Sequence, residues 1–199
     1  MATVGPGWWT GRVDLLSAHE RAMTEFDRRV RAVPPDGWDA PTPCSDWSVR
    51  DLVNHLVSEQ RWAPWLLYGA TLEEVGGRFD GDVLGDDPTA AWAEAATAAR
   101  EAFTKPGALS RRVHTSGGVI PAEEYGWQMT VDLAVHAWDL AKGIRGDDRI
   151  DPELAAAALD VVRPQVAQWQ GLGIFDPPVN VPEHADAQTR LLGLLGRRR

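Results

Sequence analysis

The sequence has 199 residues, of which 44% are hydrophobic and 25% are charged, and this predicts one globular domain over residues 1–199. A formal net charge of −9 with scattered basic residues disfavours a nucleic-acid surface, and no apolar run approaches the roughly 18–20 residues that would span a bilayer. A single cysteine, Cys44, excludes an internal disulfide framework and fits a reducing, cytoplasmic location.

The first predicted helix covers residues 14–33. Apolar residues recur there at alternating steps of three and four, which is the spacing of one helix face. The residues of this face are Leu16, His19, Met23, Phe26, Val30 and Val33. We therefore expect His19 to be buried, and we expect the helix to end at Pro34-Pro35 because proline cannot continue it.

A second helix is predicted to begin at Val49. Ser48 and Asp51 stand at the spacing of a capping box, in which each side chain binds the other residue's backbone N–H. The inward face of this helix should carry Leu52, His55, Leu56, Glu59, Ala63 and Leu66. His55 is then directed towards the core about two turns from the capped end.

The later elements follow from proline, glycine and apolar spacing. A Gly- and Asp-rich connection, typical of a crossover or a lid, covers residues 69–87. Helices are expected over 88–104, from near 121 to 143 or 146, over 152–170 and over 186–195, with a small hairpin within 109–120. The pattern as a whole predicts an all-α protein with one minor hairpin.

The helix expected to follow Pro121 contains the most informative pair of polar residues. Asp132 and His136 are four positions apart, so they share a helix face. Apolar residues at Met129, Leu133 and Leu140 surround them, which places the pair in a buried stripe. A buried carboxylate needs a partner or a metal ion.

His55, Asp132 and His136 could form a metal site in a helical bundle, where ligands come from inward side chains of facing helices. Two imidazoles and a carboxylate suit Zn²⁺, Ni²⁺ or Fe²⁺ and leave positions open for water or substrate. The competing interpretation is that these histidines are hydrogen-bonded core residues without a metal.

Four other features leave alternatives open. His19 could be a fourth ligand, a partner of a ligand or a packing residue. Asp139 could orient a ligand histidine, but we favour a structural bond to another segment because a residue three positions after His136 should reach its ring poorly. Cys44 could be an activated thiol, with a buried and inert one favoured. The basic tail, residues 197–199, is expected to be solvated.

Two segments resemble the DinB-like metal-binding four-helix-bundle superfamily. They are TPCSDWSVRDLVNHLV, residues 42–57, and DLAVHAWDLAKG, residues 132–143. The likeness is greater to actinobacterial proteins related to the N-terminal domain of mycothiol-dependent maleylpyruvate isomerase, and the ending QTRLLGLLGRRR also resembles a branch of that group. The resemblance implies a DinB-like four-helix bundle with additional C-terminal helices and at most a small hairpin. It also implies that His55, Asp132 and His136 hold the metal, although the isomerase pattern has glutamate at the position of Asp132.

The resemblance implies one divalent metal, with zinc preferred to nickel or iron, and a thiol cofactor such as mycothiol. We expect a transferase or isomerase that acts on a small electrophilic substrate. The isomerase has a second domain that this chain is too short to contain, so its substrate is not transferred. A non-catalytic metal or small-molecule binder and a metal-assisted hydrolase are the alternatives. We expect a monomer or homodimer without nucleic-acid or membrane partners, and a site lined by Glu59, Trp62 and Trp127.

Overall fold

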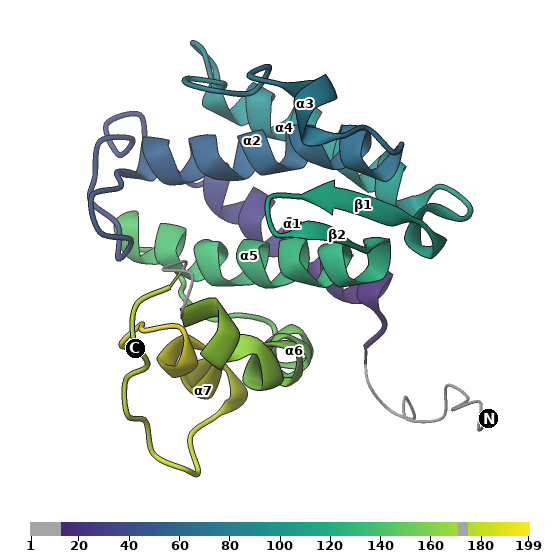
Figure 1. The fold of residues 1–199 in the computed structure, drawn as a ribbon. Coiled ribbons are helices and arrows are strands. Elements are labelled where there is room, and N and C mark those ends of the chain that lie inside the picture. The colour runs from purple at the N-terminus through teal and green to yellow at the C-terminus, as the bar shows by residue number, and fades with distance from the viewer. Residues whose placement is uncertain (1–12, 171–174) are drawn as a thin grey trace, which may run out of the picture.

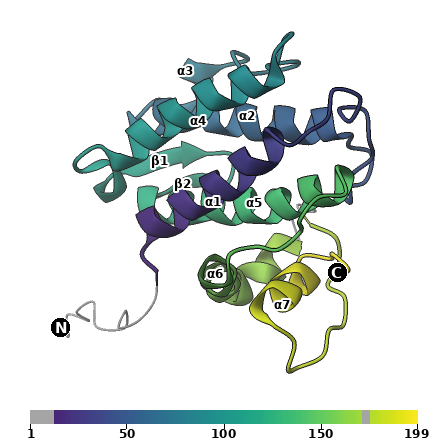
Figure 2. The same ribbon diagram turned by 180° about the vertical axis from the view of Figure 1, so that it is seen from behind.

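A four-helix bundle forms the centre of the computed structural model, which describes residues 13–170 and 175–199. The four helices are α1 (Leu15–Val30), α2 (Val49–Leu67), α4 (Pro88–Thr104) and α5 (Ala122–Gly143). Helix α1 packs mainly on α5, and α2 packs mainly on α4. Figure 1 shows α2 and α4 in an upper layer, and Figure 2 shows α1 lying across the face of α5 on the other side of the molecule. The expected all-α fold is confirmed.

The hairpin and the C-terminal helices surround this bundle. Strands β1 (Arg112–Thr115) and β2 (Gly118–Pro121) pair antiparallel, with Val113 opposite Ile120, and follow the short helix η1 (Ala108–Ser110). The hairpin lies beside α2 and α5 (Figure 1). Helices α6 (Pro152–Gln170) and α7 (Ala187–Leu194) pack on each other, and α6 also contacts α5. No helix in the described part of the chain has the length and apolar character needed to cross a membrane.

The start of α2 is fixed by the capping box that the sequence predicts. The Ser48 hydroxyl accepts a hydrogen bond from the Asp51 backbone N–H at 3.2 Å, and the Asp51 carboxylate accepts one from the Ser48 backbone N–H at 3.0 Å. These bonds satisfy N–H groups that the first turn of a helix otherwise leaves free. The helix therefore begins at Val49, and this sets the direction in which His55 points.

The connection between α2 and α4 crosses over α2 and is bound to it. It contains the short helix α3 (Leu72–Val75). Three side chains of α2 bind this connection: Asn54 donates to the Gly81 carbonyl oxygen at 2.8 Å, Ser58 donates to the Phe79 carbonyl oxygen at 3.0 Å, and Arg50 pairs with Asp82 at 2.8 Å. The sequence predicted either a crossover or a lid for this connection, and in the structure it is a crossover.

Candidate metal centre

Three potential ligands come together where α2 faces α5. The His55 Nε2 atom lies 3.4 Å from Asp132 Oδ2, and the His136 Nε2 atom lies 3.3 Å from Asp132 Oδ1. One donor atom from each of the three side chains lies within 4.8 Å of the others. The spacing of four along α5 puts Asp132 and His136 on one face, and the packing of α2 against α5 brings His55 to them.

The donor atoms are close enough together for one ion to contact all three side chains. When nitrogen and oxygen ligands each lie 2.0–2.1 Å from a tetrahedral centre, two neighbouring ligands are about 3.3–3.4 Å apart. The two observed nitrogen-to-oxygen distances, 3.4 Å to Asp132 Oδ2 and 3.3 Å to Asp132 Oδ1, are of this size and end on different oxygens of the carboxylate. Two imidazoles and one carboxylate are also a donor set that zinc accepts. The residues present therefore fit a divalent metal with a position left open.

The charges of Asp132 and His136 stabilise each other in the metal-free protein. Burial alone would raise the pKa of Asp132, but His136 and His55 hold it well below its usual range. Burial alone would lower the pKa of His136, but contacts with Asp132, Asp139 and Cys44 raise it well above its usual value. A metal ion that replaces the proton between Asp132 and His136 would balance the negative charge of Asp132 in its place.

Asp139 binds the other nitrogen of the His136 ring. The Asp139 Oδ2 atom is 3.0 Å from His136 Nδ1, and the Asp139 side chain is fully buried. The expectation that Asp139 reaches this ring poorly is wrong, because the His136 ring has Nε2 next to Asp132, one turn earlier in the helix, and Nδ1 next to Asp139, in the following turn. Nδ1 then keeps its proton, so an ion that displaces the Nε2 proton would meet the Nε2 lone pair on the side of Asp132 and His55.

Cys44 and Arg197 complete the surroundings of Asp139. The Cys44 thiol donates to Asp139 Oδ2 at 3.2 Å and lies 3.6 Å from His136 Nδ1. Cys44 is half-buried, so the expected full burial of this thiol is wrong. Arg197 binds both carboxylate oxygens of Asp139, with Nη2 to Oδ2 at 2.9 Å and Nε to Oδ1 at 3.3 Å. Cys44 and Asp139, together with His136, also form a second group of potential metal ligands.

The prediction that the basic tail is solvated is wrong for Arg197. Its side chain is only 10% exposed, whereas Arg198 and Arg199 are exposed. The preceding residue, Gly196, has φ +81, and a Cβ there would collide with the backbone of Asp176. This turn leads Arg197 inward towards Asp139. The only hint in the sequence that the chain turns here is Gly196, which precedes the first arginine of the tail. The partner of Arg197 cannot be predicted from the sequence.

Two cavities reach the ligand cluster. One, of about 600 Å³, is lined by Cys44, Trp47, His55, Asp132, His136 and Arg197 among others. The second, of about 330 Å³, lies between α2, the hairpin and α5, and its walls include His55, Asp132, Glu59 and Tyr125. Trp47 packs against the rings of both histidines, with centroid distances of 5.0 Å to His55 and 5.8 Å to His136. The cluster is thus walled by an aromatic side chain and accessible from two directions.

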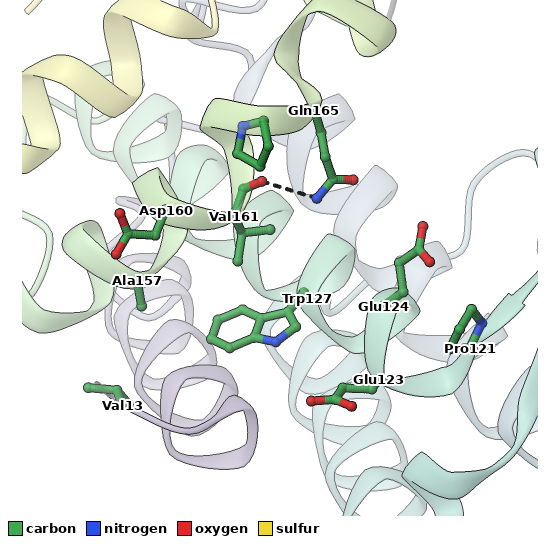
Figure 3. Close-up of a pocket in the computed structure, with 10 residues that line it drawn as sticks. Val13, Pro121, Glu123, Glu124, Trp127, Ala157, Asp160, Val161 and Gln165 are labelled. Carbon is green, nitrogen blue, oxygen red and sulfur yellow. Dashed lines mark hydrogen bonds between the residues drawn. The ribbon is translucent and has the colours of Figure 1, made fainter. Parts of the chain in front are cut away.

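The other residues considered from the sequence lie in different places. Glu59 lines the smaller cavity, as expected. Trp62 packs on Phe79 at 6.1 Å, and Trp127 lies in a separate groove between α5 and α6, where Figure 3 shows it near Val161. Neither tryptophan lines the two cavities at the cluster. Helical phase gave the direction of each side chain, but it could not say which neighbouring helix that side chain would meet.

His19 is not part of the cluster. It is 3% exposed, and its Nδ1 atom is 3.1 Å from the Thr130 hydroxyl on α5. Its ring also packs against Phe103, with the centroids 4.5 Å apart. His19 therefore connects α1 with α5 and α4 by packing, and the described residues offer no fourth histidine ligand to close the cluster.

Comparison with known proteins identifies the family and the fold. A family model described as "Mycothiol maleylpyruvate isomerase N-terminal domain" matches residues 19–141. An uncharacterized protein of Mycobacterium tuberculosis, recorded for two strains, is 35% identical over 191 residues, which are 93% of this chain and 98% of that protein. Crystal structures of the mycothiol-dependent maleylpyruvate isomerase and of a histidine-to-alanine mutant superpose with TM-scores of 0.57 and 0.58. Both cover 80% of this chain and 71% of the other, at 17% identity, and therefore share its fold.

Proposed function

The chain belongs to the mycothiol maleylpyruvate isomerase N-terminal domain family. We propose that it is a metal-dependent transferase or isomerase. The reaction uses a low-molecular-weight thiol of the mycothiol type and a small electrophilic substrate. The observation that carries the proposal is the convergence of His55, Asp132 and His136 at the meeting point of two cavities. A site with three protein donors leaves room for a further ligand, which is typical of catalytic metal sites.

In this proposal His55 Nε2, His136 Nε2 and the Asp132 carboxylate would hold one divalent ion, with zinc preferred on the donor types. The ion supplies Lewis acidity and lowers the pKa of a thiol that binds beside it. Asp139 accepts a hydrogen bond from His136 Nδ1–H and fixes the orientation of the ring. Trp47 packs against both histidine rings and so limits how they can turn.

His19 bears on the choice between a catalytic and a structural site. A fourth protein ligand would close the coordination shell and favour a structural metal. The residue considered for this role, His19, is bound to Thr130 and packed on Phe103 instead. Together with the two cavities at the cluster, this supports the catalytic interpretation over a non-catalytic binder.

The experiment is a thiol titration of the cobalt-substituted protein, followed by absorption spectroscopy. We expect a sulfur-to-cobalt charge-transfer band that saturates with mycothiol, because a thiolate would occupy the open position. The matched control is the analogue of the thiol in which oxygen replaces sulfur, which should produce no such band. No change in the charge-transfer region at saturating thiol would overturn the proposal.

A further inference from the structure

A groove of about 570 Å³ lies between α5 and α6, and Val13, at which the described chain begins, forms part of its wall. Its large apolar side chains are Val13, Trp127 and Val161, which are only partly buried against the core. Figure 3 shows the Trp127 ring near Val161, with Glu123 and Glu124 on the α5 side. Exposed apolar surface gathered in a concave site is typical of a place where another segment binds.

The charged side chains of this groove are acidic. Glu123 and Glu124 of α5 and Asp160 of α6 line it, and the described residues of its walls include no lysine or arginine. Apolar surface surrounded by carboxylates favours an occupant that combines large apolar side chains with a positive charge.

The segment that precedes Val13 has this composition. Residues 1–12, which lie outside the described part of the chain, contain Trp8, Trp9 and Arg12 and no acidic residue. The two tryptophans are four and five positions before Val13, and five residues of chain extend at most about 18 Å. Successive side chains of an extended segment point to opposite faces, so one of the two tryptophans can face the groove in either orientation. Because the segment is attached at the wall of the groove, its effective concentration there is far above that of a separate chain.

We propose that residues 1–12 dock in this groove, with one of the two tryptophans packed on Trp127 and Val161. The indole buries its own apolar surface and that of the groove, which stabilises the docked arrangement. Arg12 then lies near the carboxylates of the groove, which attract its positive charge.

Docking here places the segment next to the smaller cavity at the ligand cluster. Glu124 and Gln165 line both the groove and that cavity. The docked segment would therefore support these two side chains of the cavity wall and hold α6 against α5. The docking does not depend on the metal ion or on the thiol proposed above.

Photochemical cross-linking in the full-length protein tests the docking. Trp8 and Trp9 are replaced in turn by p-benzoylphenylalanine, an aromatic residue of similar size that bonds to a neighbouring C–H group on irradiation. We expect at least one of the two positions to cross-link to residues 121–127 or 157–165 of the same chain, as identified by mass spectrometry. The control places the same probe at Glu94, an exposed position of α4 in the layer away from α6 (Figure 1), and should give no cross-link to the groove.

A mixture of unlabelled and isotope-labelled protein identifies the chain that the probe reaches. Cross-links that join a labelled chain to an unlabelled one would show that a second copy occupies the groove. The absence of cross-links to the groove from both positions would show that the segment does not bind there. Either result would overturn the proposal.

Thermal denaturation gives a second measurement. The double variant W8S/W9S should lower the denaturation midpoint by about 2–4 °C, because an indole would no longer be buried. In protein that already carries Trp127→Ala, the same two substitutions should cost much less, because their contact has been removed. In protein that carries Val119→Ser, at an exposed position of β2 outside the groove, the loss from W8S/W9S should be unchanged. No loss, or an equal loss with and without Trp127, would overturn the docking on this side chain.

Discussion

Arg197 and Asp139 form a buried ion pair across 58 positions of sequence, with 2.9 Å between Nη2 and Oδ2. The pair ties the C-terminal tail to α5 directly behind His136, whose Nδ1 atom binds the same carboxylate oxygen. The guanidinium contributes to holding the pKa of Asp139 below its usual range, against the effect of burial. The end of the chain thereby supports the residue that orients a proposed metal ligand.

Replacing Arg197 with methionine should destabilise the protein by about 1–3 kcal/mol, because the fully buried Asp139 would lose its hydrogen bonds to the guanidinium and keep only those to His136 and Cys44. Methionine keeps an unbranched apolar chain of similar length, so most of the loss reports the charge. Chemical denaturation measures the change. The control is Arg198→Met at an exposed neighbouring position, which should cost less than about 0.5 kcal/mol. Equal losses for the two variants would refute a stabilising role for the pair.

Asp139→Asn should weaken metal binding by about 10- to 100-fold, because an amide orients the His136 ring less strongly than a carboxylate does. A competition titration against a chromophoric chelator, made under conditions where circular dichroism shows the variant to be folded, measures the affinity. Asp148→Asn, which removes a partner of Lys142 at the surface, should bind metal as the unaltered protein does. Unchanged affinity in Asp139→Asn would show that the contact is structural only.

The ligand assignment predicts the metal content of three variants. His55→Ala, Asp132→Ala and His136→Ala should each lose stoichiometric metal, since each removes one of three protein donors. Elemental analysis of protein purified in the presence of zinc provides the measurement. His184→Ala, which alters an exposed histidine, should retain the metal. Full metal content in His136→Ala would refute the ligand set.

Local signals predicted much of this architecture. The capping box at Ser48 and the proline after Asp87 identified where α2 and α4 begin, because caps depend on residues adjacent in sequence. The spacing of Asp132 and His136 likewise placed them on one face. The expected bond from Asp139 to another segment is present, but its partners Cys44 and Arg197 could not be named, because these contacts join residues 95 and 58 positions apart and depend on tertiary packing.

His19 should make stability sensitive to acid. The hydrogen of the Thr130 hydroxyl goes to the Gly126 carbonyl oxygen at 2.7 Å, so this hydroxyl accepts a hydrogen bond from His19 Nδ1–H. The Nε2 atom of His19 is buried and has no hydrogen-bond partner among the described residues. Burial, assisted by the positive charge of Arg100, lowers the pKa of His19 to about 4. Protonation in the folded state would place an unpaired charge beside Phe103.

The unfolded chain therefore binds this proton more readily, since an exposed histidine has a pKa of about 6.5. Stability is unaffected above that pH and falls as the pH drops from about 6.5 towards 4, by up to about 3 kcal/mol from this residue. His19→Gln cannot titrate, so its stability should decline less over the same interval, even if it is lower at neutral pH. Denaturation midpoints of both proteins across this range, at fixed metal saturation, measure the difference. Parallel pH profiles would show that His19 is protonated equally in the folded and unfolded states, contrary to its burial.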